Sequence, residues 1–164
     1  MSSMITAVFE SPSDATLAIN RLHEAGFAHS EINVLTSDKV GREGFGIEKG
    51  NKAAEGAAIG GGVGGAVVAI IAGLTAVGAI ASGGLGLLAS GPIIAALAGA
   101  GAGAAAGGLL GGLVGMGIPE HQAKLYEDRL KNGGTLVGVK AEGERAKRAT
   151  EIFELYQPNS VTRV

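Results

Sequence analysis

The sequence contains no cysteine, which excludes disulfide bonds and thiolate metal sites. It has no tryptophan, four phenylalanines and two tyrosines, so few large rings are available to fill a core. Its thirteen lysines and arginines are outnumbered by fifteen aspartates and glutamates, and the net charge of −2 provides no basic field. We therefore expect no nucleic-acid partner.

Charge is also missing from one long stretch of the chain. From Gly56 to Pro119 no residue is charged and none is histidine, so all thirteen basic residues lie outside this stretch. The distribution predicts a first polar half, a linker, an apolar glycine-rich block and a second polar half, at 1–37, 38–55, 56–118 and 119–164.

Glycine is abundant instead, with 30 in the chain, and many of them fall in the glycine-rich block. Two rows of small residues recur at every fourth position there, which places each row on one ridge of a helix. Since an interior glycine costs a helix about 1 kcal/mol relative to alanine, such a helix needs a close neighbour, as in GxxxG packing. The glycines predicted to make helix–helix or oligomer contacts are Gly61, Gly65, Gly73, Gly99, Gly103, Gly107, Gly111 and Gly115.

The glycine-rich block predicts a hairpin of two helices, 57–81 and 92–116, joined by a turn at 82–91. Each helix would be about 37 Å long, enough to cross a hydrocarbon core of about 30 Å. Two arrangements of such a hairpin fit: insertion in a bilayer, or burial inside a soluble cytoplasmic homo-oligomer. The third alternative for the block is a disordered stretch of low complexity. Because basic residues crowd both flanks and the turn carries no charge, an inserted hairpin would leave both termini in the cytoplasm.

The two polar halves have the patterns of ordinary strands and helices. The first predicts a strand at 4–10, a helix between the N-cap Ser11 and Gly26, and a strand at 31–37. The second predicts a helix between Pro119 and Gly133, a strand at 135–141, a helix at 142–156 and a strand at 160–164. The expected apolar faces are Leu17, Ala18, Leu22 and Ala25 in the first helix, and Ala123, Leu125, Tyr126 and Leu130 in the helix after Pro119.

Together the two halves have the element order of a split, ferredoxin-like β-α-β sandwich. The predicted fold class is α+β: a ferredoxin-like domain with a Gly/Ala-rich helical hairpin inserted between its second and third strands. In this arrangement the strands at 4–10 and 135–141 lie side by side at the centre of the sheet.

The residues predict no catalytic, cofactor or metal site. The stretch GGGVGG at 60–65 matches G-x-G-x-x-G, but no strand leads directly into it. His23, His29 and His121 fall on different elements and lack the spacing of metal ligands.

Two stretches, AVFESPSDATLAINRLHEAGFAHSEINVL (7–35) and GMGIPEHQAKLYEDRLKNGGTLVGV (115–139), flank the glycine-rich block. In this order they resemble the bacterial general-stress proteins of the heat-induced YflT type. The resemblance covers nearly the whole chain and implies a bacterial, stress-associated protein without catalytic activity. It brings no active-site residues.

Three classes of function are compared. The first is a non-catalytic protein that self-assembles and associates with membrane or lipid through the hairpin. The second, by fold analogy alone, is a ferredoxin-like regulatory module that senses a small ligand; the third, an enzyme, has no supporting residues. A ligand sensor should have a polar pocket at the sheet, whereas a structural protein should bury its largest surface on the glycine rows.

Overall fold

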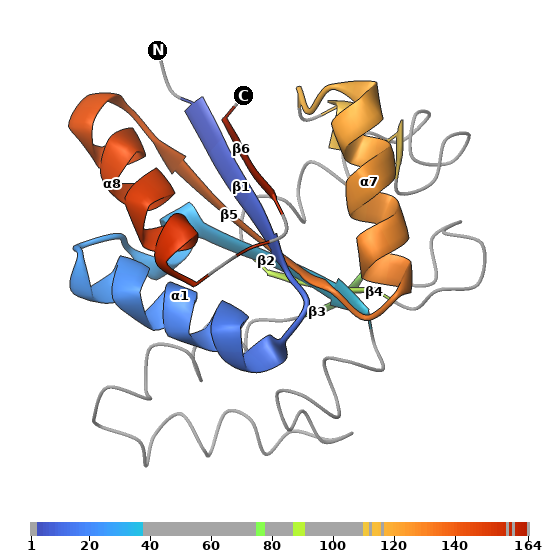
Figure 1. Cartoon of the computed structure of the whole chain (residues 1–164), viewed down its shortest axis with the longest axis horizontal. Coiled ribbons are helices and arrows are strands. Elements are labelled where there is room, and N and C mark those ends of the chain that lie inside the picture. Colours follow the sequence, from blue (N-terminus) through green and yellow to red (C-terminus); the bar gives the residue numbers. More distant parts are fainter. Residues whose placement is uncertain are drawn as a thin grey trace.

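The computed structural model describes residues 3–37, 75–77, 87–90, 110–111, 113–115, 117–156, 158 and 160–163. In these residues an antiparallel sheet is combined with helices, so the fold is mixed α/β (Figure 1). The strands are β1 (Ser3–Phe9), β2 (Ile32–Ser37), β3 (Thr75–Val77), β4 (Leu87–Ser90), β5 (Thr135–Ala141) and β6 (Ser160–Arg163). The helices are α1 (Pro12–Glu24), the 3-10 helix η1 (His29–Glu31), α7 (Glu120–Lys131) and α8 (Gly143–Leu155).

The sheet has the strand order β3-β4-β2-β5-β1-β6, and every neighbouring pair is antiparallel. β1 pairs with β5 over its whole length, from Ser3 opposite Ala141 to Phe9 opposite Thr135. On their outer sides β6 flanks β1 and β2 flanks β5. The prediction that the strands at 4–10 and 135–141 lie side by side is confirmed, and the two polar halves share one sheet.

One face of the sheet is covered by α1 and α8 (Figure 1). Because side chains alternate along a strand, Ile5, Ala7 and Phe9 of β1 all point into this face. Phe9 meets Phe153 of α8 edge to face, with ring centroids 6.0 Å apart. The helices bury Ala15, Ala18, Ile19 and Leu22 from α1 and Ala146, Ala149, Ile152 and Phe153 from α8.

The opposite face of the sheet carries α7 (Figure 1). Val8, Leu35 and Leu136, from three adjacent strands, form the sheet side of this second hydrophobic cluster. The other side consists of residues of α7 and of the segment that precedes it: Ala123, Tyr126, Leu130, Leu113 and Ile118. The sheet therefore lies between two separate cores.

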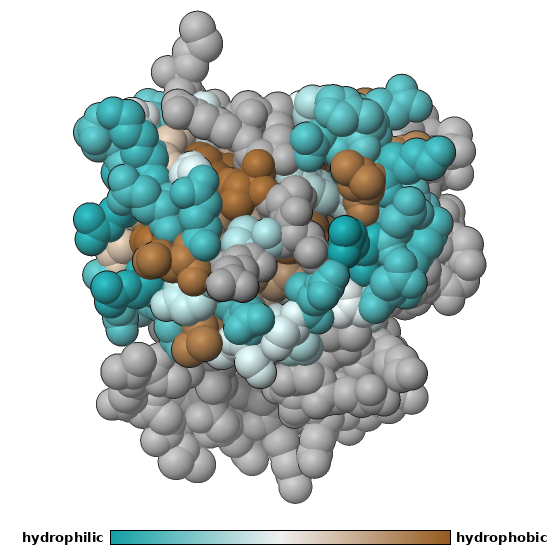
Figure 2. Space-filling view, in the orientation of Figure 1, coloured by the Kyte–Doolittle hydropathy of each residue, from teal (hydrophilic) through white to brown (hydrophobic). Residues whose placement is uncertain are grey.

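Two of the predicted apolar positions are wrong. Leu17 of α1 is 48% exposed and Leu125 of α7 is 53% exposed. The side of α1 that faces the sheet includes Ala15 and Ile19, and Leu17 lies outside it. The direction in which the helix packs, and not the hydrophobicity of each residue, decides which positions are buried. On the face of the molecule shown in Figure 2, hydrophilic residues cover much of the outer surface of α7 and α8, and hydrophobic residues lie among them.

The ends of α1 agree with the signals in the sequence. The Ser11 hydroxyl accepts a hydrogen bond from the Ser13 N–H at 3.2 Å, and Pro12 occupies the first helical position. Gly26 ends the helix with a φ of 89°, and the N–H groups of Gly26 and Phe27 donate to carbonyls of the last turn. This is the Schellman motif, in which a residue of positive φ satisfies the carbonyls at a helix end.

The glycine-rich block differs from the prediction where the structure describes it. Residues 75–77, expected inside the helix 57–81, form β3, and residues 87–90, expected in the turn 82–91, form β4. β4 pairs with β2, and β3 pairs with β4. The spacing of small residues does not reveal that the edge of β2 offers unpaired backbone groups, and the β-branched Thr75 and Val77 favour a strand.

The rest of the predicted hairpin, together with the linker 38–55, lies outside the described residues. This applies to six of the eight predicted contact glycines: Gly61, Gly65, Gly73, Gly99, Gly103 and Gly107. In the part of the chain that the structure describes, no helix combines the length and the apolar character needed to cross a bilayer.

A substitution at Ala89 can distinguish a strand from a turn at residues 87–90. It lies between Leu35 of β2 and Thr75 of β3, so its N–H faces a neighbouring strand whichever way it points. Proline at this position would remove the donor, and we expect Ala89→Pro to lower the free energy of unfolding by about 1–3 kcal/mol. Urea unfolding followed by circular dichroism measures this loss.

The matched control is Ala89→Val, which keeps the N–H and has a higher strand propensity. It should unfold close to the wild-type midpoint. Equal midpoints for the proline variant, the valine variant and the wild type would contradict the position of β4 between β2 and β3.

Candidate functional site

A helical turn at the end of the glycine-rich block, residues 110–111 and 113–115, presents two contrasting sides. Leu113 is fully buried in the cluster under α7. Val114 is 41% exposed, and Gly115 is also exposed. The turn is therefore anchored to the sheet on one side and open to solvent on the other.

Gly117 fixes the orientation of this turn. Its φ is 89°, its N–H donates to the Val114 carbonyl at 2.9 Å, and the Ile118 N–H donates to the Leu113 carbonyl at 3.2 Å. These two bonds form a second Schellman motif, with Leu113 and Ile118 as its hydrophobic pair. The exposed position of Val114 is thus set by a defined helix end.

Two of the eight predicted contact glycines are described. Gly111 is helical and partly exposed, and Gly115 is helical and exposed. A β-carbon added to Gly115 would meet nothing within 4 Å. Among the described residues, therefore, no helix packs against the end of the glycine row at Gly115.

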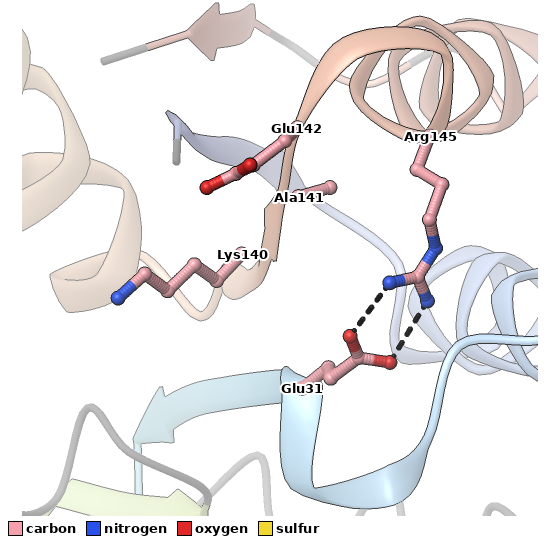
Figure 3. Close-up of a pocket in the computed structure, with 5 residues that line it drawn as sticks. All are labelled: Glu31, Lys140, Ala141, Glu142 and Arg145. Carbon is pink, nitrogen blue, oxygen red and sulfur yellow. Dashed lines mark hydrogen bonds and ion pairs between the residues drawn. The ribbon is translucent and has the colours of Figure 1, made fainter. Parts of the chain in front are cut away.

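A pocket of about 390 Å³ opens between the end of β5 and the start of α8 (Figure 3). Its lining consists of Glu31, Lys140, Ala141, Glu142 and Arg145. Arg145 and Glu31 point toward each other across one side, while the side chains of Lys140 and Glu142 point away from them (Figure 3). Four of its five lining residues have charged side chains, which is the kind of lining that a sensor of a charged small ligand would require.

Arg145, however, already has partners. Its guanidinium donates two hydrogen bonds of 2.9 Å to the Glu31 carboxylate and one of 3.3 Å to the Gly26 carbonyl. The same group lies 4.6 Å from the centroid of the Phe27 ring. This set of contacts joins the start of α8 to the loop between α1 and β2, so it favours a structural role for the arginine.

The ion pair changes the acidity of its carboxylate. Hydrogen bonding from Arg145, assisted by the Ala28 N–H, lowers the pKa of Glu31 below its ordinary value of 4.5. The sequence gives no sign of this pair, because the two residues are 114 positions apart. No local spacing signals such a contact.

The histidines give no sign of a metal site in the residues that the structure describes. His23 lies exposed on α1 and His121 lies exposed on α7, and His29 begins η1. Across the described ranges, no three His, Cys, Asp or Glu side chains come together in a way that could hold a metal ion.

Replacing glycine by alanine should have opposite effects on the free energy of unfolding at Gly115 and at Gly134. At Gly115 the space is open, so Gly115→Ala should raise the free energy of unfolding by about 0.5–1 kcal/mol through helix propensity. At Gly134 an added β-carbon would lie 2.9 Å from the Arg129 carbonyl oxygen and 3.2 Å from a Val8 methyl. Gly134→Ala should therefore be destabilising by about 1–3 kcal/mol. Urea unfolding of both variants measures the two changes, and a loss at Gly115 as large as that at Gly134 would contradict the open site.

The low pKa of Glu31 predicts a pH-dependent contribution to stability. The carboxylate stabilises the folded chain above its ordinary value of 4.5, and this contribution is lost as the pH falls through the lower, folded-state pKa. Glu31→Gln should therefore unfold at a lower urea concentration than the wild type at pH 7, and the difference between the two midpoints should narrow as the pH falls below 4.5. Glu144→Gln, at a mostly exposed carboxylate paired locally with Lys147, is the control and should show a smaller gap. A gap for Glu31→Gln that stays constant with pH would contradict the prediction.

Comparisons with known protein families, with curated proteins and with solved structures find no match for this chain. The resemblance of residues 7–35 and 115–139 to the general-stress proteins therefore stays a prediction. The proposed function therefore rests on the geometry of the described residues.

Proposed function

We propose that the protein is a non-catalytic, self-assembling protein whose copies meet through the glycine-rich block. The observation that carries this proposal is the exposed turn at Val114 and Gly115. Gly115 belongs to the row of glycines at every fourth position, and the space beside it is open. Leu113 holds the same turn against the core, so a partner helix would meet a rigid surface.

We further propose that the two polar halves form a ferredoxin-like domain. Its four strands are β1, β2, β5 and β6, in the sheet order β2-β5-β1-β6, with all neighbours antiparallel. α1 and α8 lie on the same face of these strands. This arrangement supports a split β-α-β sandwich with the glycine-rich block inserted between β2 and β5, since each helix connects two strands that are separated by one neighbour.

Association with lipid is proposed as a second property of the glycine-rich block. The absence of charge from Gly56 to Pro119 supports it. Because β4 pairs with β2 in the sheet of the domain, we propose contact with a lipid surface and not a spanning hairpin with residues 82–91 on the far side. β1 and β6 are neighbours in that sheet, which supports placing both termini on one side, in the cytoplasm. On the resemblance to general-stress proteins, we propose that the assembly acts during stress.

Self-assembly is tested by enlarging or charging the exposed turn. Gly115→Leu should fill the space that a partner helix needs, and Val114→Lys should place a charge in the contact. The leucine is expected to weaken association roughly tenfold to a hundredfold, because overpacking costs about 1–3 kcal/mol. The lysine is expected to weaken it at least as much, because an unpaired charge is costly to bury. Size-exclusion chromatography with light scattering, over a dilution series, measures the change.

The control is Leu155→Lys, at a leucine of α8 that is 68% exposed. It should leave the assembly unchanged. The remainder of the glycine row is tested by Gly107→Leu against Ala106→Leu, which lies off the row and should be milder. A monomeric wild type, or equal association in all variants, would overturn the proposal.

Lipid association is measured separately, by sedimentation with phosphatidylcholine–phosphatidylglycerol vesicles. Binding of the assembled protein would support contact with lipid. Assembly of full strength together with no vesicle binding would instead support a soluble oligomer that buries the block.

A further inference from the structure

α7 is attached to the sheet less extensively than the other two long helices. It is the one long helix on the second face in the part of the chain that the structure describes, and its outer surface is mostly polar. Only three of its residues are buried, Ala123, Tyr126 and Leu130, against four each in α1 and α8. Among the described long helices, α7 therefore has the fewest buried residues to expose on local opening.

One polar contact holds the middle of α7 to the centre of the sheet. The Tyr126 hydroxyl lies 3.1 Å from the Thr6 hydroxyl of β1, and both residues are fully buried. Breaking a buried hydroxyl pair of this kind is costly, because each hydroxyl loses a hydrogen bond at a place where the core holds it away from water. At the edge of the helix, Arg129 also pairs with Glu10 at 2.7 Å, but both of these side chains are largely exposed.

Glycines of positive φ lie on both sides of α7. Gly117, at 89°, precedes it, and Gly133, at 94°, follows it. Each of them ends a helical segment with a Schellman motif, so the chain changes direction sharply on either side of α7. A movement of α7 would be confined between these two turns.

We propose that α7 is a detachable cover on the second face of the sheet, held closed by the Tyr126–Thr6 hydrogen bond, and that closure is coupled to assembly. The coupling rests on the proposed function. Leu113 is packed in the same cluster as Tyr126, whereas Val114, the next residue, is exposed. A partner that binds the ordered turn at Val114 and Gly115 would therefore stabilise the closed position of α7.

Linkage makes the coupling reciprocal. Assembly should lower the equilibrium population of the open form of α7, and loosening α7 should weaken assembly by the same factor. The two effects can be measured independently on the full-length protein.

The opening is measured by thiol labelling, which the absence of native cysteine makes specific. Ala123→Cys places a thiol on the buried side of α7, where Ala123 is 0% exposed. Adding Tyr126→Phe to this variant should increase the labelling rate by about fivefold to tenfold, because one partner of the buried hydroxyl pair is lost. Circular dichroism establishes that both variants are folded before labelling.

Two matched controls separate local opening from general unfolding. Ala146→Cys places a thiol on the buried side of α8, under the first face, and its labelling should change little when Tyr126→Phe is added. Thr36→Val breaks a second buried hydroxyl pair, which Thr36 forms with Thr135 at 3.2 Å, away from α7. This change should not accelerate the labelling of Ala123→Cys more than the labelling of Ala146→Cys. Equal acceleration at positions 123 and 146 would overturn the detachable cover.

The coupling is tested with the same thiol over a range of protein concentrations. Labelling of Ala123→Cys should slow as the protein assembles, and Tyr126→Phe should raise the concentration at which assembly is half complete. Assembly without any change in labelling would overturn the coupling. A protein that never assembles would overturn the proposed function, while selective acceleration at position 123 would still support the detachable cover.

Discussion

The pairing of β1 with β5 is the constraint on which the rest of the structure depends. The two strands belong to polar halves that the glycine-rich block separates, and their register places Ser3 opposite Ala141. Since β6 and β2 flank this central pair on either side, neither half completes the sheet alone. Within the glycine-rich block, β3 and β4 extend the same sheet beyond β2, and Leu113 packs in the cluster under α7, so the block is joined to the domain at more than one place.

The two faces of the sheet are built from different kinds of contact. The face under α1 and α8 is apolar and includes the aromatic pair Phe9–Phe153. The face under α7 combines a smaller apolar cluster with the buried Thr6–Tyr126 hydroxyl pair. Because Leu113 belongs to this second cluster, the end of the glycine-rich block is packed as part of the domain. Packing at this face and the exposure of Val114 and Gly115 are therefore linked.

The features that the sequence predicted correctly have local causes. Ser11, Pro12 and Gly26 mark the ends of α1 through bonds within a few residues, and the order of the elements led to the central pairing of β1 and β5. The failures arise from contacts across the chain. Residues 87–90 form a strand because they pair with the edge of β2. Leu17 is exposed because of the direction in which α1 packs on the sheet. The Arg145–Glu31 pair joins residues that no sequence motif connects. At the candidate site, spacing predicted the glycine row, but only the structure shows that Gly115 is open.

The neighbouring positions of the first and last strands have a consequence for how the chain can be cut and joined. Ile5 lies opposite Arg163, and both ends of the chain emerge at the same end of the sheet (Figure 1). A short peptide joining them would connect α7, β5, α8, β6, β1, α1 and β2 without interruption. In such a circular order the glycine-rich block is no longer an insertion but the segment that closes the ring. A permuted chain opened between β4 and α7 would carry all six strands of the sheet in one continuous stretch.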